Sequence, residues 1–274
     1  ISNNVSISSG GFRLPVYNGE RFLKETLNSI LDQKFSNYEV IISNNDSTDK
    51  TEAICQEYIS KDARIKYFKQ KNNIGSLKNY NFVLQNAIGN YFMWQAADDL
   101  LADKEYLNIL IEKFTSDTNY VFPDVKIIDS KGKIIRSNLM LPFQNAKTRF
   151  DFAKASIKSN SQLIYGLFKT SIIKEDFNLL EKFSDLLCYG EGYFVHVVST
   201  ERKGKFVPKA CKLYRRHDAM QSIALPASKL IPFYIKYAKS SLKYFYICRY
   251  FSVTQKFKLL LPMIIKFSRY IVYL

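Results

Sequence analysis

The sequence predicts an α/β protein with a Rossmann-like, mostly parallel central sheet that is flanked by helices. Short β-rich runs alternate with helical patterns three times over roughly the first 100 residues, which is typical of strand–helix–strand units. Polar clusters directly follow two of these runs, as expected for ligand groups at the carboxyl ends of parallel strands. The 274 residues are 47% hydrophobic, which is enough to bury a sizeable core.

The first half of the chain provides the elements of this pattern in order. The segment that includes VSI and LPVY predicts a first strand, and the apolar residues that follow recur at helical spacing. The polar run NNDSTDK offers hydroxyl groups that would cap a second helix. We expect helices at about 20–33, after NNDSTDK and at 76–87, and strands at 38–43, at 65–69 and in YFMWQAA.

From Tyr120 the pattern changes to two strand-like runs. The turn signal Asp129–Gly132 joins them, which predicts a hairpin at an edge of the sheet. The segment between this hairpin and the C-terminal tail mixes helical and strand-like stretches, so its elements are predicted only coarsely.

The C-terminal residues 226–274 form a basic tail in which Lys and Arg are spaced among aromatic and aliphatic residues. No acidic residue follows Asp218, and the nine basic residues of the tail account for much of the net charge of +15. This pattern is typical of basic amphipathic helices in an anionic membrane interface, and a helical cap with a basic outer face is the alternative. The apolar run Leu259–Ile265 is too short to span a bilayer and contains Pro262.

The charge excess leaves nucleic acid, anionic lipid and nucleotide phosphates as candidate partners. Nucleic acid is the less favoured class, because no known binding module occurs and the excess is concentrated in the tail. The four cysteines lack metal-ligand spacing, which favours a reducing compartment. The first residues also lack the pattern of a secretory signal. We therefore expect a cytoplasmic protein, peripheral at the inner face of the plasma membrane.

Two adjacent carboxylates, Asp98 and Asp99, directly follow an apolar strand. Both would emerge into the crevice at the carboxyl end of that strand. Oxygen ligands of this kind suit Mg²⁺ or Mn²⁺, which keep coordination positions open for phosphate oxygens. A simple helix cap is the alternative interpretation.

Four segments, in order over about residues 14–136, resemble successive motifs of the family 2 glycosyltransferases, and the last is similar to bacterial cell-surface polysaccharide members. The resemblance implies a GT-A fold in a domain at 1–225, with a donor-binding half at 1–122 and an acceptor-side half at 123–225. It also implies inverting, metal-dependent transfer of a hexose from a nucleotide-diphosphate-sugar, with UDP expected, to a glycan or lipid-linked acceptor. The four segments are PVYNGERFLKETLNSILDQKF, YEVIISNNDSTDKTEAI, NNIGSLKNYNFVLQNAIGNYFMWQAADDLL and YVFPDVKIIDSKGKII.

The resemblance places two motifs around the nucleotide. The Pro-x-Tyr-Asn turn of the family cradles the nucleoside, although a packed aromatic at the strand end is the alternative for the tyrosine. The second motif usually carries an acidic pair where this chain has two asparagines, so the identity of the nucleotide base is less defined. An amide can still hydrogen bond to the edge of a nucleotide base. The nucleotide-binding residues implied are Pro15, Tyr17, Asn18, Glu20, Asn44 and Asn45.

The ADD sequence matches the DxD-like element of the family, which implies that Asp98 faces the ribose or a metal-bound water and that Asp99 binds Mn²⁺ or Mg²⁺. LYRRHDAMQS resembles the closing basic segment. His217 would bind the metal, and Arg215 and Arg216 would contact the diphosphate. A solvated basic turn is the alternative.

The resemblance also implies a carboxylate base in the second half of the domain. CYGEGYF occupies that region and makes Glu191 the candidate, with Asp185 as the second choice and a surface glutamate as the alternative. Because the asparagine pair and Glu191 depart from the family pattern, a catalytically idle nucleotide-sugar binder or scaffold is the other functional class.

Overall fold

The computed structural model describes residues 10–158, 161–181, 198–218 and 251–272. Its strands are β1 (Gly10–Val16), β2 (Tyr38–Asn44), β3 (Ile65–Lys69), β4 (Tyr91–Trp94), β5 (Leu100–Leu101), β6 (Tyr120–Ile128), β7 (Ile134–Arg136), β8 (Leu167–Lys169) and β9 (Gly204–Arg215). The α-helices are α1 (Leu23–Leu31), α2 (Thr51–Ile59), α3 (Ser76–Gln85), α4 (Tyr106–Ile111), α5 (Arg149–Lys158), α6 (Thr170–Glu181) and α9 (Val253–Val272). The short 3-10 helices η1 (Leu141–Phe143) and η2 (Ser161–Tyr165) complete the set.

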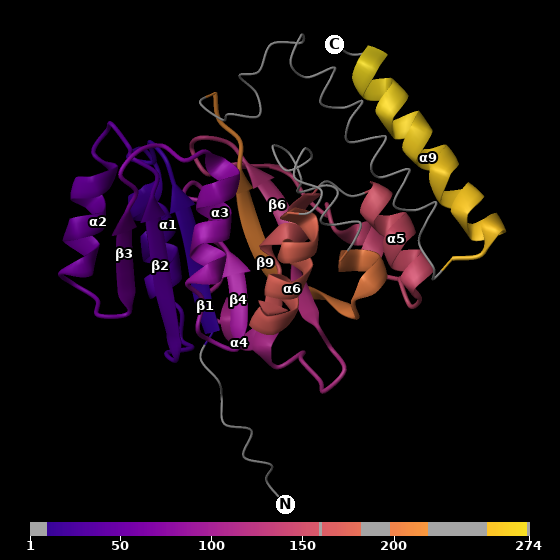
Figure 1. The fold of residues 1–274 in the computed structure, drawn as a ribbon, viewed down its shortest axis with the longest axis horizontal. Helices are drawn as coiled ribbons and strands as arrows, with labels where there is room; N and C mark the ends of the chain where they lie inside the picture. The colour runs from indigo at the N-terminus through magenta and orange to yellow at the C-terminus, as the bar shows by residue number, and fades with distance from the viewer. Residues whose placement is uncertain (1–9, 159–160, 182–197, 219–250, 273–274) are drawn as a thin grey trace, which may run out of the picture.

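One sheet runs through the molecule in the order β3-β2-β1-β4-β8-β6-β9-β5, with β7 paired to β6 (Figure 1). The first four strands of this order are parallel, and helices connect them in the chain. Such crossover connections bring the carboxyl ends of the strands to one edge of the sheet. The α/β Rossmann-like fold predicted from the sequence is confirmed, and its fully parallel part is the first half of the sheet.

The second half of the sheet is mixed. β8 pairs antiparallel with both β4 and β6, whereas β9 runs parallel to β6. The predicted turn at Asp129–Gly132 does join β6 to β7, but β6 is an interior strand rather than an edge. Its first residues, Tyr120–Phe122, are fully buried, because the strand has a neighbour on each edge and packed side chains cover both of its faces.

Two buried clusters cover the two faces of the sheet. In β2, Val40 and Ile42 belong to one cluster and Ile41 to the other, as the two-residue period of a strand requires. Side chains of α1, α2 and α4 complete the first cluster, and those of α3, α5 and α6 complete the second. Helices on both faces explain why the parallel strands appear in the sequence as continuous apolar runs.

Helix α9 belongs to the described part of the basic tail. Its Leu259 and Met263 are buried in the second cluster, and Phe251, just before the helix, packs edge-on against Phe150 of α5. The opposite side of the helix is exposed, as described below. Among the described residues, no helix has both the length and the hydropathy needed to cross a membrane.

Candidate active site

A pocket of about 400 Å³ opens beside the ends of the parallel strands. Five stretches of chain line it, and they are far apart in the sequence. They include the turn after β1, one residue after β2, the start of α3, the segment after β4 and one residue after β9. The lining residues are Pro15, Val16, Tyr17, Asn18, Gly19, Arg21, Phe22, Asn45, Asn73, Gly75, Ser76, Asn79, Tyr80, Ala96, Ala97, Asp98 and His217.

The Pro-Tyr-Asn turn lies at this pocket and is locked to the loop after β2. The amide of Asn18 donates to Ser47 Oγ at 2.9 Å, and the amide of Thr48 donates to Asn18 Oδ1 at 2.9 Å. Asn18 adopts a φ of 51°, which its short polar side chain tolerates. Tyr17 remains 40% exposed, so its ring is available to a ligand.

Glu20 also hydrogen bonds to the segment after β2, and it is not one of the residues that line the pocket. Its amide donates to Asp49 Oδ2 at 3.0 Å, and its own carboxylate accepts from the amide of Lys50 at 2.8 Å. The structure therefore places Glu20 where it holds the turn after β1 against the start of α2.

The two asparagines after β2 have different surroundings. Asn44 is fully buried, donates to the Tyr67 hydroxyl at 2.9 Å and accepts from the amide of Ser47 at 3.0 Å. Asn45 lines the pocket, but its amide group already donates to Asn73 Oδ1 and accepts from the amide of Ile74. Both side chains thus organise the loops around the pocket.

Asp98 and His217 meet at one end of the pocket. His217 Nε2 lies 3.0 Å from Asp98 Oδ2, and both residues contribute to the lining. The centre of the Phe22 ring lies 4.9 Å from the centre of the His217 imidazole. The phenyl ring therefore limits the positions that the imidazole can adopt. In the chain, Asp98 precedes β6 and His217 follows β9. The fold therefore brings together two residues that are far apart in the sequence.

Asp99 occupies a different place from the one expected of a metal ligand. Its side chain is 0% exposed and does not line the pocket. Its Oδ1 accepts from the amide of Arg215 at 2.9 Å, and Lys212 Nζ lies 3.4 Å from its Oδ2. Burial raises the pKa of Asp99 to about 7, while the Lys212 ammonium opposes this increase. The Asp99 carboxylate thus faces the Lys212 ammonium rather than the pocket.

Arg215 is also buried beneath the pocket instead of facing it. Its Nε donates to the carbonyl of Asp98 at 2.9 Å, and its NH2 group donates to Glu25 Oε2 at 2.6 Å. Its guanidinium carbon lies 4.5 Å from the centre of the Phe22 ring. Arg215 therefore fixes the backbone of Asp98, whereas Arg216 is exposed and is not among the lining residues.

Several lining residues were not found by the sequence reasoning. Asn73 lies in the loop before α3, Ser76 and Asn79 lie at the start of that helix, and Arg21 comes from the turn before α1. The segment NNIGSLKNYN was recognised as a motif, but its individual contacts depend on how α3 packs. The charge of Arg21 carries no distinguishing signal in a chain with 40 Lys and Arg.

The predicted catalytic base lies outside the described residues. Glu191 and its alternative Asp185 both fall between 181 and 198, so the pocket is described without them.

The donor set suits a divalent cation only in part. Within the described ranges, no group of three or more His, Cys, Asp or Glu side chains could hold a metal. Asp98 and His217 provide a carboxylate oxygen and an imidazole nitrogen, and the His217 Nδ1 atom is buried without a hydrogen-bond partner. Such a pair suits Mn²⁺ when phosphate oxygens and water supply the other ligands.

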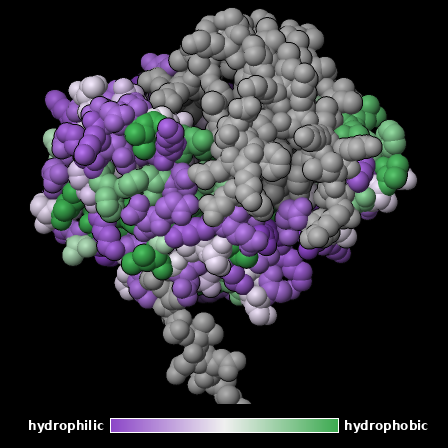
Figure 2. Space-filling view, in the orientation of Figure 1, coloured by the Kyte–Doolittle hydropathy of each residue, from purple (hydrophilic) through white to green (hydrophobic). Residues whose placement is uncertain are grey.

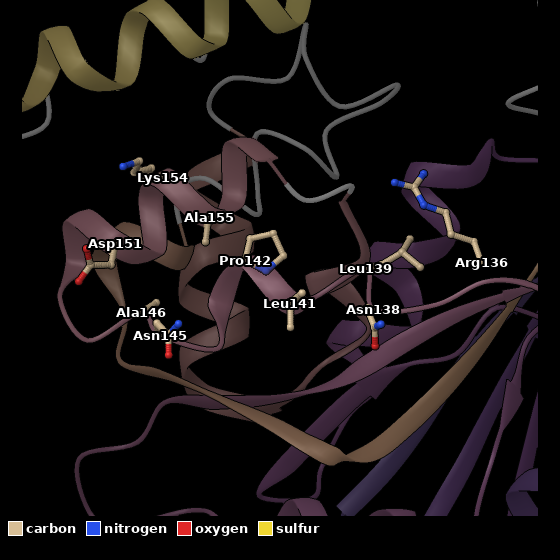
Figure 3. Close-up of a pocket in the computed structure, with 10 residues that line it drawn as sticks. All are labelled: Arg136, Asn138, Leu139, Leu141, Pro142, Asn145, Ala146, Asp151, Lys154 and Ala155. Atoms are coloured by element: carbon tan, nitrogen blue, oxygen red, sulfur yellow. The ribbon is translucent and has the colours of Figure 1, made fainter.

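A second hollow of about 550 Å³ lies between β7, η1 and α5 (Figure 3). Arg136 lies at one end of the row of side chains, and Asp151 and Lys154 of α5 lie at the other. The Asp151 carboxylate accepts hydrogen bonds from the backbone amides of Lys147 and Thr148. These two donors partly offset its negative charge.

Comparison with known proteins identifies the family. Residues 13–173, more than half of the chain, match the family model described as glycosyl transferase family 2. The chain belongs to the family 2 glycosyltransferases. A glycosyltransferase of this family, the GalNAc(5)-diNAcBac-PP-undecaprenol beta-1,3-glucosyltransferase of Campylobacter jejuni, is 28% identical over 221 residues, which cover 79% of this chain and 67% of that protein.

Solved glycosyltransferase structures have the same fold. Staphylococcus aureus TarS 1-349 in complex with UDP-GlcNAc gives a TM-score of 0.69 at 18% identity, over 94% of this chain and 72% of that one. The mannosyltransferase PcManGT of Pyrobaculum calidifontis, in complex with GDP-Man and Mn²⁺, gives a TM-score of 0.55 at 15% identity. The match covers 95% of this chain and 70% of that one. At these identities the likeness concerns the fold.

Other glycosyltransferases of the family are much longer than this chain. An uncharacterized glycosyltransferase of Rickettsia conorii is 34% identical over 128 residues, which are 45% of this chain but only 20% of that protein. A Rickettsia bellii relative is matched over 18% of its length.

Proposed function

We propose that this glycosyltransferase transfers a hexose from a UDP-sugar, with inversion, to a glycan or lipid-linked acceptor in surface polysaccharide synthesis. The observation that carries the proposal is the pocket itself, whose lining includes both the exposed Tyr17 and the Asp98–His217 pair. An aromatic ring suits a nucleoside, and a carboxylate beside an imidazole suits a metal-bound diphosphate. The complex of S. aureus TarS with UDP-GlcNAc, a structure of the same fold, supports the choice of UDP.

Asp98 and His217 are the residues that would hold Mn²⁺ or Mg²⁺ in this pocket. When bound, the cation would offset the negative charge that the diphosphate gains as it leaves the sugar. Asp98 is the better assignment than Asp99, because Asp98 faces the pocket and Asp99 faces the Lys212 ammonium. The Arg215 guanidinium and the Asp98 carbonyl then keep the metal-facing carboxylate in position before the donor arrives.

The chain divides into a donor side at 1–122 and an acceptor side at 123–225. We assign the catalytic base to Glu191, with Asp185 as the alternative, since an inverting transfer needs a carboxylate on the acceptor side. The hollow between β7 and α5 is also on that side, and its lining of amides, aliphatic groups and two cations suits a glycan acceptor. The C. jejuni relative is named for an undecaprenol-linked acceptor, which supports a lipid-linked one here.

The tail at 226–274 would hold the enzyme at the cytoplasmic face of the plasma membrane, near such an acceptor. Val253, Phe257 and Leu261 of α9 are 73%, 69% and 62% exposed and recur every four residues, which places them on one side of the helix. Figure 2 shows hydrophobic side chains at the edge of the described surface where α9 begins. Lys256 and Lys258 flank this stripe, a combination that suits an anionic lipid surface.

Titration calorimetry with UDP tests the donor proposal. We expect UDP to bind in Mn²⁺ and to bind about tenfold or more weakly in EDTA, because two protein ligands and the diphosphate would share the cation. Asp98→Asn should remove most of this difference, whereas Asp32→Asn, an exposed carboxylate paired with Lys104, should leave it unchanged. Equal UDP affinity in Mn²⁺ and in EDTA would refute metal-dependent donor binding.

A catalytically idle nucleotide-sugar binder is the second candidate. It is favoured by the asparagines at the position of the acidic pair of the family. The two candidates differ in turnover: an idle binder would bind UDP-sugars but would release no UDP from them, with or without acceptor.

A further inference from the structure

Arg21 lies in the turn between β1 and α1, and its side chain lines the donor pocket together with Asp98 and His217. Its guanidinium carbon lies 4.8 Å from the centre of the Phe22 ring, and the same ring contacts the His217 imidazole. Arg21 thus lies near the Asp98–His217 pair, because Arg21 and His217 contact the same Phe22 ring.

The other basic residues expected near the diphosphate are placed elsewhere. Arg215 is 1% exposed and bound to Glu25 and to the Asp98 carbonyl. Arg216 is exposed and does not line the pocket. Among the described residues that do line it, Arg21 is the only Lys or Arg. As it leaves the sugar, the diphosphate of the donor gains negative charge beyond what one divalent cation neutralises, so a guanidinium beside it would stabilise the leaving group.

Arg21 already makes an ion pair with Asp218, which is not one of the lining residues. Its NH1 group lies 2.9 Å from Asp218 Oδ1, and Asp218 directly follows His217 in the chain. The two side chains are 52% and 87% exposed, and a pair this exposed contributes little to stability because water and salt screen it. Exchanging Asp218 for a phosphate therefore costs little, while Arg and phosphate form a stronger bidentate contact.

We propose that Arg21 binds the diphosphate of the donor and that Asp218 holds its guanidinium beside the pocket until the donor arrives. The inference rests on the proposed donor function and assigns a residue to its phosphate end. No covalent bond forms or breaks in this step, because the Arg21 guanidinium only exchanges one anionic partner for another. The pair at 2.9 Å would separate on donor binding and re-form on UDP release.

Calorimetry of Arg21→Gln with uridine, UMP and UDP in Mn²⁺ tests the assignment. We expect UDP affinity to fall roughly 10- to 100-fold, the range of one charge-assisted contact, with uridine affinity unchanged within about twofold. Arg21→Lys should recover part of the UDP affinity, because it keeps the charge but loses the planar fork. Lys24→Gln is the matched control, since Lys24 is 54% exposed, pairs with Glu57 and lies on α1 away from the pocket.

Asp218→Asn provides an independent test with the opposite sign. Releasing Arg21 from its carboxylate partner should leave UDP affinity equal or raise it, by at most about fivefold, which is the upper limit for an exposed pair. A pronounced loss of UDP affinity in Asp218→Asn would contradict the holding role. The urea midpoints of all variants should match that of the wild type, because none of these side chains is buried.

The outcomes separate this inference from the proposed function. If the wild-type protein binds UDP and Arg21→Gln binds it equally well, the assignment of Arg21 is wrong and the donor function stands. An equal loss for uridine and UDP would also overturn it, because a damaged pocket would explain the result. If the wild-type protein binds no UDP, the donor proposal and this inference fail together.

Discussion

At pH 8, where Asp99 is ionised, Lys212→Met should destabilise the folded protein by about 3–5 kcal/mol, because it leaves the Asp99 carboxylate buried without the ammonium that faces it. Both side chains are 0% exposed, and the two charges lie 3.4 Å apart. Methionine has a similar length and is apolar, so it keeps the contact with the Tyr165 ring that the lysine makes at 3.7 Å. The loss would be a large part of the roughly 5–15 kcal/mol that stabilises a typical domain.

The loss should depend on pH, with a sign set by Asp99. Its pKa is about 7 when folded and about 3.9 when unfolded, so between these values the folded state binds more protons. Stability therefore falls as the pH rises from about 4 to 7. Without Lys212 the pKa of the folded carboxyl rises further, which makes the Lys212→Met deficit larger at pH 8 than at pH 5.

Urea unfolding of a double-mutant cycle measures the effect. Asp99→Asn alone leaves the Lys212 ammonium buried without its partner, whereas the double variant with Lys212→Met removes both charges and should regain part of the lost stability. Lys34→Met, which removes an exposed lysine paired with Glu105, should change little. If the single losses simply add, to within about 0.5 kcal/mol, then the two side chains do not interact and the reasoning is refuted.

Three further predictions concern other parts of the chain. Glu191→Gln should lower turnover about 100-fold or more with donor binding nearly intact, and an active Glu191→Gln beside an inactive Asp185→Asn would move the base to Asp185. Phe257→Glu should reduce flotation with anionic liposomes, and flotation of the unaltered chain with neither anionic nor neutral liposomes would rule out the membrane role. Gly204→Ala should cost about 1–3 kcal/mol in urea unfolding, because its methyl group would overlap a buried tyrosine ring, while Gly10→Ala meets an atom only at 3.9 Å.

The elements of the donor half could be predicted because their patterns are local. Tyr38–Ser43 and Ile65–Lys69 are apolar runs bounded by polar residues, and they correspond to β2 and β3 with at most one residue of difference. The helix predicted at 76–87 is α3, two residues shorter. The apolar runs of the strands and the helical spacing of α3 both lie within the segments themselves, so these elements follow from local sequence.

The surroundings of the site residues depend on partners that are distant in the sequence, and this is why they could not be predicted. Asp98 and Asp99 are adjacent and chemically identical, yet one faces the pocket and the other faces Lys212, 113 positions further on. Nothing in the ADD sequence indicates which is which. The interior position of β6 is a similar case, because it depends on β8 and β9 pairing with it from later in the chain.

The asparagine pair now limits how the base of the donor is recognised. Asn44 is buried and bonded to Tyr67, so it does not reach the pocket, and both ends of the Asn45 amide hold the loop at 73–74. A carboxylate at position 45 would repel the side-chain Oδ1 of Asn73, whereas the Asn45 amide both donates and accepts, which fits the two bonds observed. Asn45 therefore positions the loop, and under the proposed donor function base recognition would fall to that loop and to the exposed Tyr17. Selectivity for uridine should consequently change more in Asn73 variants than in Asn44 variants, as the relative affinities for UDP and GDP would measure.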